Sequence, residues 1–101
     1  MWVMVMFDLP SVTKRERGRY VRFRRAILKL GFEMKQKSIY LRWEETVAAS
    51  ESTCKRVLNL APAEGHVTVL PITPKAMAKV RDQVDLEEQG APVQPEEFLI
   101  C

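Results

Sequence analysis

The sequence predicts a single α+β domain, and three observations lead to that prediction. The chain has 101 residues, a length that suits one modest core. Stretches with the apolar pattern of strands alternate with stretches that have the period of helices. The resulting order is strand, helix, strand, strand, helix, strand, which is the ferredoxin-like arrangement. We expect the domain to span residues 1–85, and residues 86–101 to form a linker and a C-terminal edge strand.

The first strand is expected to be apolar on both faces. Residues 2–7 form a continuous apolar run that ends at Asp8, and such a run is typical of a strand covered on both sides. The helices of a small domain cover one face of its sheet, so the face with Met4, Met6 and Asp8 needs a second partner. This pattern favours a dimer. The run is also far shorter than the ~20 residues that span a membrane, so we expect no membrane association.

A basic helix is predicted after the turn at Pro10. Thr13 and Glu16 have the spacing of a capping box, and Gly31 ends the helix, which gives it a range of about 14–30. The apolar stripe of this helix consists of Tyr20, Phe23, Ile27 and Leu30. The opposite face consists of Lys14, Arg15, Arg22, Arg25 and Lys29.

The remaining elements complete the order. Alternating patterns over residues 32–36 and 38–43 predict an antiparallel pair of strands with a tight bend between them. A second helix is expected over residues 45–60 and a further strand over residues 67–72. The apolar positions near helical spacing in that second helix are Val47, Cys54, Val57, Leu58 and Ala61.

The segment from Pro74 to about residue 85 is expected to hold one short helix through Met77 and Val80. An acidic stretch with glycine and prolines follows, and its composition is that of a linker. Residues 98–101 are apolar again, which predicts a short edge strand that needs a sheet to join.

Charge is distributed unevenly along the chain. The net charge is +3, but residues 1–43 contain eleven Lys or Arg and only three acids, a balance of +8. The remaining residues have five basic and ten acidic side chains, a balance of −5. The first half therefore offers the surface for a polyanion.

The five cations on the face opposite the apolar stripe of the predicted helix have no acidic residue among them. A solvated helix face is the ordinary role of such side chains. Unpaired arginines nevertheless favour phosphate contact, because Arg binds phosphate through two hydrogen bonds. The candidate nucleic-acid ligands are Lys14, Arg15, Arg22, Arg25 and Lys29, and Lys35 and Lys37 are expected to extend the same surface.

Asp8 is the one carboxylate of the first strand. An aspartate in the turn before Pro10 commonly accepts backbone hydrogen bonds, which is the structural interpretation. A single carboxylate is a poor magnesium site, but a two-fold axis beside it would supply a second Asp8. Catalysis is then a property of the dimer. His66 is expected to be an exposed edge residue with no part in that site.

The two cysteines give no sign of a zinc site. Cys54 and Cys101 have neither the Cys-x-x-Cys spacing nor a histidine at ligand spacing. We therefore expect a reducing compartment and a cytoplasmic protein.

Several motifs, in this order, resemble those of CRISPR-associated protein 2, in the form found with type II systems. The N-terminal motifs are Phe7-Asp8-Leu9-Pro10, Arg17 and Phe23-Arg24 in the basic helix, Gly31-Phe32, and Gln36-Lys37-Ser38-Ile39-Tyr40. The downstream segments Ala61–Gly65 and Val69–Thr73 fit the same family. The resemblance therefore covers nearly the whole chain.

The resemblance implies a homodimer with facing sheets, in which the C-terminal strand of each chain extends the partner's sheet. It also implies a bridging role between two dimers of the CRISPR-associated integrase during spacer acquisition. It further implies a magnesium-dependent endoribonuclease activity, in which the aspartate at the end of the first strand is the catalytic and metal-binding residue. That position is Asp8 here.

Three functions stay open at this point. The leading one is a scaffold that lays its basic surface along double-stranded DNA and holds the integrase. The second is a metal-dependent nuclease centred on paired Asp8 residues, acting on single-stranded RNA. The third is an RNA-binding module of the RNA-recognition-motif type, which the sequence disfavours because the first and third strands lack the aromatic pattern of that module.

Overall fold

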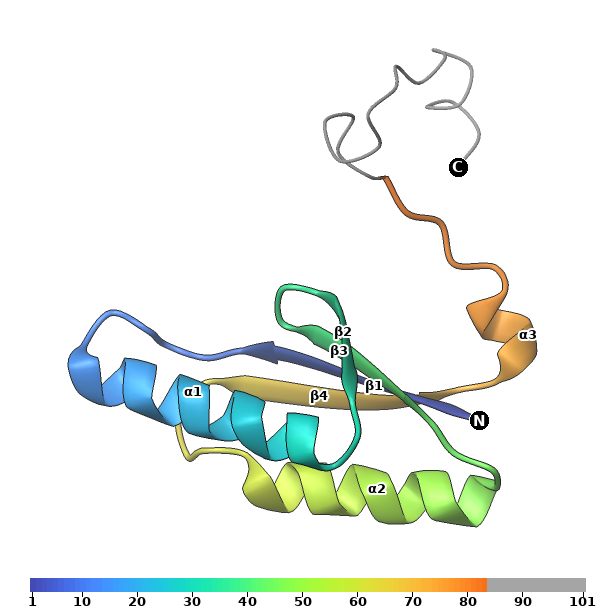
Figure 1. The fold of residues 1–101 in the computed structure, drawn as a ribbon, viewed down its shortest axis with the longest axis horizontal. Coiled ribbons are helices and arrows are strands. Elements are labelled where there is room, and N and C mark those ends of the chain that lie inside the picture. Colours follow the sequence, from blue (N-terminus) through green and yellow to red (C-terminus); the bar gives the residue numbers. More distant parts are fainter. Residues whose placement is uncertain (84–101) are drawn as a thin grey trace.

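The computed structural model describes residues 1–83 (Figure 1). Its elements are β1 (Trp2–Asp8), α1 (Lys14–Lys29), β2 (Glu33–Gln36), β3 (Ile39–Trp43), α2 (Val47–Leu60), β4 (His66–Ile72) and α3 (Pro74–Met77). The strands form one antiparallel sheet in the order β2-β3-β1-β4. This confirms the predicted α+β class, and the strand order is consistent with a ferredoxin-like fold. The edge strand expected at residues 98–101 lies outside the described residues.

One face of the sheet is covered by α1 and α2, which lie side by side below the strands in the view of Figure 1. The buried side chains of β1 are Val3, Val5 and Phe7, as the alternation predicted. The Phe7 ring stacks on Tyr40 at a centroid distance of 5.6 Å and meets Phe23 of α1 edge to face at 5.2 Å. Burial of side chains of this size contributes about 1.5–3 kcal/mol each. This cluster holds α1 on the sheet and thereby fixes which side of α1 faces solvent.

The other face of the sheet, here called the open face, is apolar. The register places Met4 between Leu41 and Leu70 on this face. The rings of Trp2 and Trp43 meet edge to face at a centroid distance of 5.3 Å. Leu70 is 47% exposed and Trp43 is 42% exposed. The open face is therefore apolar, as the sequence predicted for the second side of β1. Large exposed apolar surfaces commonly mark an interaction site.

Helix α2 faces the core with other residues than the sequence predicted. Val47 and Leu58 are exposed, whereas Ser50 and Thr53 are buried. The Ser50 hydroxyl donates to the carbonyl of Val47 at 2.6 Å, and the Thr53 hydroxyl donates to Oε1 of Glu44 at 2.7 Å. The expectation that Val47 and Leu58 belong to the apolar side of this helix was wrong. The two hydrogen bonds satisfy the hydroxyl groups of Ser50 and Thr53 and so allow these small polar residues to face the core.

Helix α1 begins where the capping box predicted. The N–H of Glu16 donates to Oγ1 of Thr13 at 3.1 Å, and the N–H of Thr13 donates to Oε1 of Glu16 at 2.8 Å. The hydrogen bond from the Thr13 backbone lowers the pKa of the Glu16 carboxyl. The side chain of Glu16 therefore points toward Thr13, the residue that caps α1.

Among the described residues, no helix is long and apolar enough to cross a membrane.

Candidate nucleic-acid interface and carboxylate site

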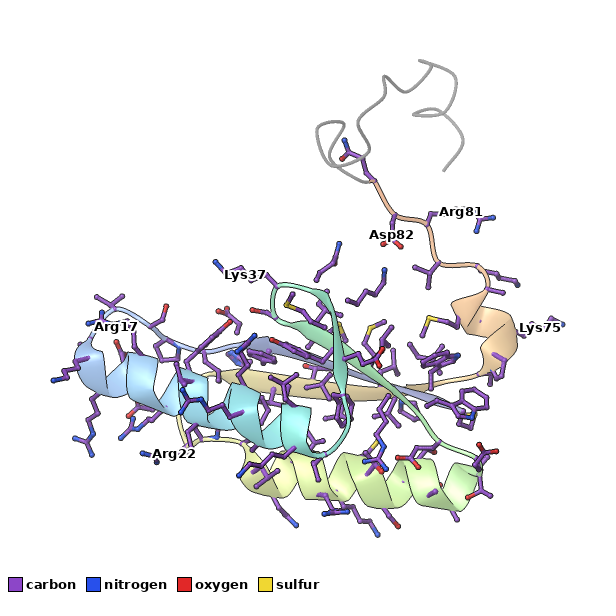
Figure 2. The ribbon with its side chains drawn as sticks, viewed as in Figure 1. Arg17, Arg22, Lys37, Lys75, Arg81 and Asp82 are labelled. Atoms are coloured by element: carbon purple, nitrogen blue, oxygen red, sulfur yellow. The ribbon has the colours of Figure 1, made fainter. Side chains whose placement is uncertain are left out.

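The five cations predicted to bind nucleic acid all lie exposed on the outer side of α1. They are called the basic face of α1 below and consist of Lys14, Arg15, Arg22, Arg25 and Lys29. Within residues 1–83 none of them forms an ion pair or a side-chain hydrogen bond. Figure 2 shows Arg22 projecting from α1 away from the sheet. The basic face is therefore a cluster of positive charge that no described carboxylate neutralises.

The other three arginines of α1 have partners inside the chain. Arg17 donates to the carbonyl of Val12 at 2.6 Å. Arg19 forms an ion pair with Glu64 at 2.9 Å, which ties α1 to the segment before β4. The Nε–H of Arg24 donates to the Tyr40 hydroxyl at 2.8 Å. Among residues 1–83, the eight cations of α1 thus divide into three that have partners within the chain and five that have none.

Two shallow hollows lie along the basic face. One is lined by Lys14, Arg15, Gly18, Arg19 and Arg22. The other is lined by Arg17, Gly18, Val21, Arg22, Arg25, Ala26 and Lys29. Gly18 and Arg22 belong to both, so the two hollows adjoin at the middle of the basic face.

Gly18 has no structural explanation within the described residues. Glycine inside a helix is about 1 kcal/mol less favourable than alanine. Gly31 and Gly65 have positive φ angles of 93° and 91°, which favour glycine, but Gly18 does not. A Cβ atom placed on Gly18 would meet no atom within 4 Å. Residues 1–83 therefore neither require glycine at this position nor exclude a side chain there.

The two lysines of the β2–β3 hairpin differ in their surroundings. Lys35 forms an ion pair with Asp82 at 2.7 Å, so its charge is matched within the chain. Lys37 lies exposed at the bend, where Figure 2 shows it projecting outward. Of these two residues, only Lys37 adds an unmatched charge to the surface.

Asp8 ends β1 on the open face, with its side chain exposed. Within residues 1–83 its carboxylate accepts no hydrogen bond, so the turn contacts of the structural interpretation are not formed. The neighbouring Phe7 N–H donates to the Ser38 carbonyl at 3.1 Å, which brings the β2–β3 bend beside this end of β1. On the other side the turn at Gly65 packs closely, because a Cβ there would lie 2.7 Å from the Asp8 carbonyl oxygen. Within residues 1–83, the Asp8 carboxylate therefore has no hydrogen-bond partner, whereas the backbone around it is held by the bend on one side and by the turn at Gly65 on the other.

His66 is the neighbour of Asp8 that the sequence analysis missed. The prediction that His66 is exposed on an edge strand is confirmed. The register of β1 with β4, however, places His66 directly opposite Asp8, and such pairs have Cβ atoms about 4.5–5.5 Å apart. The sequence does place His66 close to the start of a predicted strand. That this strand pairs with β1, and so brings His66 opposite Asp8, follows only from the topology of the sheet.

The donor set at this end of the sheet suits a hydrated hard cation better than a protein-enclosed one. Among the described residues, no group of three or more His, Cys, Asp or Glu could hold a metal ion. Magnesium is commonly held by one or two carboxylates with several waters. The single exposed carboxylate of Asp8 fits the lower limit of that coordination. Burial raises the pKa of the Cys54 thiol above its ordinary value.

Comparison with known proteins identifies the family. The family model described as CRISPR associated protein Cas2 matches residues 1–80. A CRISPR-associated endoribonuclease Cas2 of Paracidovorax avenae is 38% identical over 97% of this chain and 91% of its own length. A protein of the same name from Parvibaculum lavamentivorans is 36% identical over 99% of both chains, and one from Treponema denticola is 40% identical over 79% of both. This chain belongs to the CRISPR associated protein Cas2 family.

Proposed function

We propose that this protein acts in CRISPR spacer acquisition as a homodimer that holds double-stranded DNA on the basic face of α1 and bridges two integrase dimers. The observation that supports this most directly is the basic face itself, with five exposed cations and no described partner. Phosphate contacts by Arg and Lys bind duplexes without reading sequence. A scaffold that must accept any captured DNA needs this kind of binding.

The homodimer is proposed from the open face. Its apolar side chains cross three strands, including Met4 on β1, Leu41 on β3 and Leu70 on β4. A second copy with the same face would cover them, because a two-fold contact joins identical surfaces. That contact would leave the basic faces of α1 on the two outer sides of the assembly, since α1 covers the opposite side of the sheet. Each copy would then offer a basic face to DNA, one on either side of the dimer.

The test is duplex binding by the intact protein as a function of salt. Replacing Arg15, Arg22 and Arg25 with alanine should weaken binding equally for unrelated sequences. The slope of log affinity against log salt should fall by about 0.9 for each lost phosphate contact, close to 3 for each copy that touches the duplex. The matched control replaces Lys55, Arg56 and Lys75, three exposed cations outside α1 that have no described ion pair. If the control lowers the slope as much as the α1 variant does, the basic face is not the binding surface.

A second function, magnesium-dependent endoribonuclease activity, is favoured by Asp8. Two of these exposed carboxylates, one from each copy, would hold a cation near the two-fold axis of the proposed dimer. Magnesium there would supply an activated water and neutralise charge on the phosphodiester. Within the chain, Asp8 would orient the ion through its carboxylate, and His66 is the nearest side chain able to add a donor or a hydrogen bond. This activity would act on single-stranded RNA and would belong to the dimer.

A further inference from the structure

We propose that Gly18 is the point at which the sugar-phosphate backbone of the bound nucleic acid comes closest to α1. The proposal rests on the function proposed above and adds the position and geometry of the contact. The observation behind it is a glycine in an exposed helix that nothing in residues 1–83 explains.

The helix position of Gly18 places it among the basic residues. Lys14 and Arg15 lie four and three positions before it, and Arg22 and Arg25 lie four and seven positions after it. Residues at these spacings share one side of a helix. Gly18 therefore lies near the middle of the basic face, where the two hollows adjoin.

A position without a side chain matters most at the centre of such a face. The long side chains around Gly18 rise from the helix, so the bare backbone forms the floor of the surface between them. A phosphate that reaches this floor would lie within direct reach of cations on both sides, whereas a side chain at the floor would hold it farther out. A direct hydrogen bond from Arg or Lys to a phosphate oxygen is charge-assisted and short, so a ligand held farther out loses it.

The ligand is inferred from charge. The only acid in the first turn of α1 is Glu16, and its carboxylate is occupied by the cap at Thr13. No described residue that lines either hollow is acidic, so this surface presents positive charge, which matches a polyanion. The backbone N–H groups inside the helix are already bonded, so the contact would be made by the neighbouring cations and by close packing against the Gly18 Cα.

The test uses a series of side chains of increasing size in the full-length protein. Gly18→Ala and Gly18→Leu change no charge, and both residues are better helix formers than glycine. We expect the alanine variant to raise Tm by roughly 4–8 °C. We expect the leucine variant to keep Tm at or above that of the wild type while duplex affinity falls about tenfold, the loss of one charge-assisted hydrogen bond. Its salt slope should fall by about 1.

The control is Ser52→Leu, the same new side chain on an exposed position of α2. It should leave duplex affinity unchanged. If Gly18→Leu binds duplex as tightly as the wild type, with the arginine dependence intact, the Gly18 contact is overturned and the basic-face function stands. If Gly18→Ala lowers Tm, glycine is needed by the fold itself and the proposal is wrong. If the wild type binds no duplex, the proposed function fails and the contact fails with it.

Discussion

The basic face of α1 and the Asp8 end of β1 differ in how much of a site one chain provides. The basic face has five exposed cations on a single helix, held in place by a core that includes Phe7 and Phe23. In the part of the chain that the structure describes, the Asp8 end has one carboxylate without a hydrogen-bond partner and one histidine opposite it. The first arrangement is sufficient for phosphate binding as it stands. We propose that the second becomes a metal site in a dimer, where another chain adds a carboxylate.

This difference separates the proposed DNA-binding surface on α1 from the proposed catalytic site at Asp8. The cations are fixed by the helix that carries them and need no partner. The carboxylate lies on the open face, where the proposed second copy would determine the geometry of a shared site. A change at Asp8 should therefore affect cleavage alone, and a change on α1 should affect DNA binding. A change to an apolar side chain of the open face should affect assembly and with it cleavage.

The largest effect is expected for Asp8→Asn on RNA cleavage. The substitution removes the anion from each half of the proposed metal site and keeps nearly the same volume. Magnesium-dependent cleavage of single-stranded RNA should fall by orders of magnitude, since the activated water is lost with the metal. Duplex binding should stay at the wild-type value, because the basic face lies on the other side of the sheet. Dimer mass should also stay the same, because asparagine fills nearly the same volume on the open face. Cleavage assays, light scattering and duplex titrations on one preparation provide the three measurements.

Two results would contradict the proposal that Asp8 acts in RNA cleavage and has no part in assembly or DNA binding. Loss of the dimer in Asp8→Asn would mean that the carboxylate is structural. A wild type that cleaves no RNA with magnesium or manganese, but supports spacer integration beside its integrase, would remove the nuclease and leave the scaffold. We expect integration to survive Asp8→Asn, because bridging two integrase dimers needs a basic platform and no bond-breaking step.

The next largest effect is expected for Leu70→Glu, which places a charge on the open face. Leu70 is 47% exposed and pairs with Met4 in the register. In a two-fold contact the new charge enters twice, and burying unpaired like charges is strongly unfavourable. Light scattering should give the mass of one chain, 11.7 kDa, where the wild type gives two. The matched control is Leu58→Glu on α2, which is 51% exposed and away from the sheet and should remain dimeric.

The sequence predicted the basic face better than it predicted the Asp8 region, and the reason is physical. The five cations follow from the period of one helix, which depends on local order alone. The pairing of Asp8 with His66 depends on which strands are neighbours and on their register, and both are set by the whole sheet. The inner side of α2 was missed for a related reason. Ser50 and Thr53 are polar by composition, and only their hydrogen-bond partners make burial possible.

The smallest effect is expected at Ser38, in the bend that lies beside the end of β1. Ser38 has a φ of 70°, in the left-handed region that disfavours residues with a side chain. Its carbonyl accepts the Phe7 N–H at 3.1 Å, so the bend helps to hold the backbone next to Asp8. Glycine adopts this conformation without strain and keeps the carbonyl. Ser38→Gly therefore tests whether strain near Asp8 has a function.

We expect Ser38→Gly to raise the free energy of unfolding by up to about 1 kcal/mol, because relief of strain is partly offset by the greater freedom of glycine in the unfolded chain. Urea unfolding should show a higher midpoint with an unchanged slope. The control Ser52→Gly lies inside α2 and should lower stability, since glycine is unfavourable in a helix. If Ser38→Gly is stabilised and its RNA cleavage falls, the strained bend contributes to the Asp8 region. If it is stabilised and cleaves as the wild type does, the strain in the bend has no part in cleavage. The candidate site then consists of Asp8 on β1 and His66 on β4.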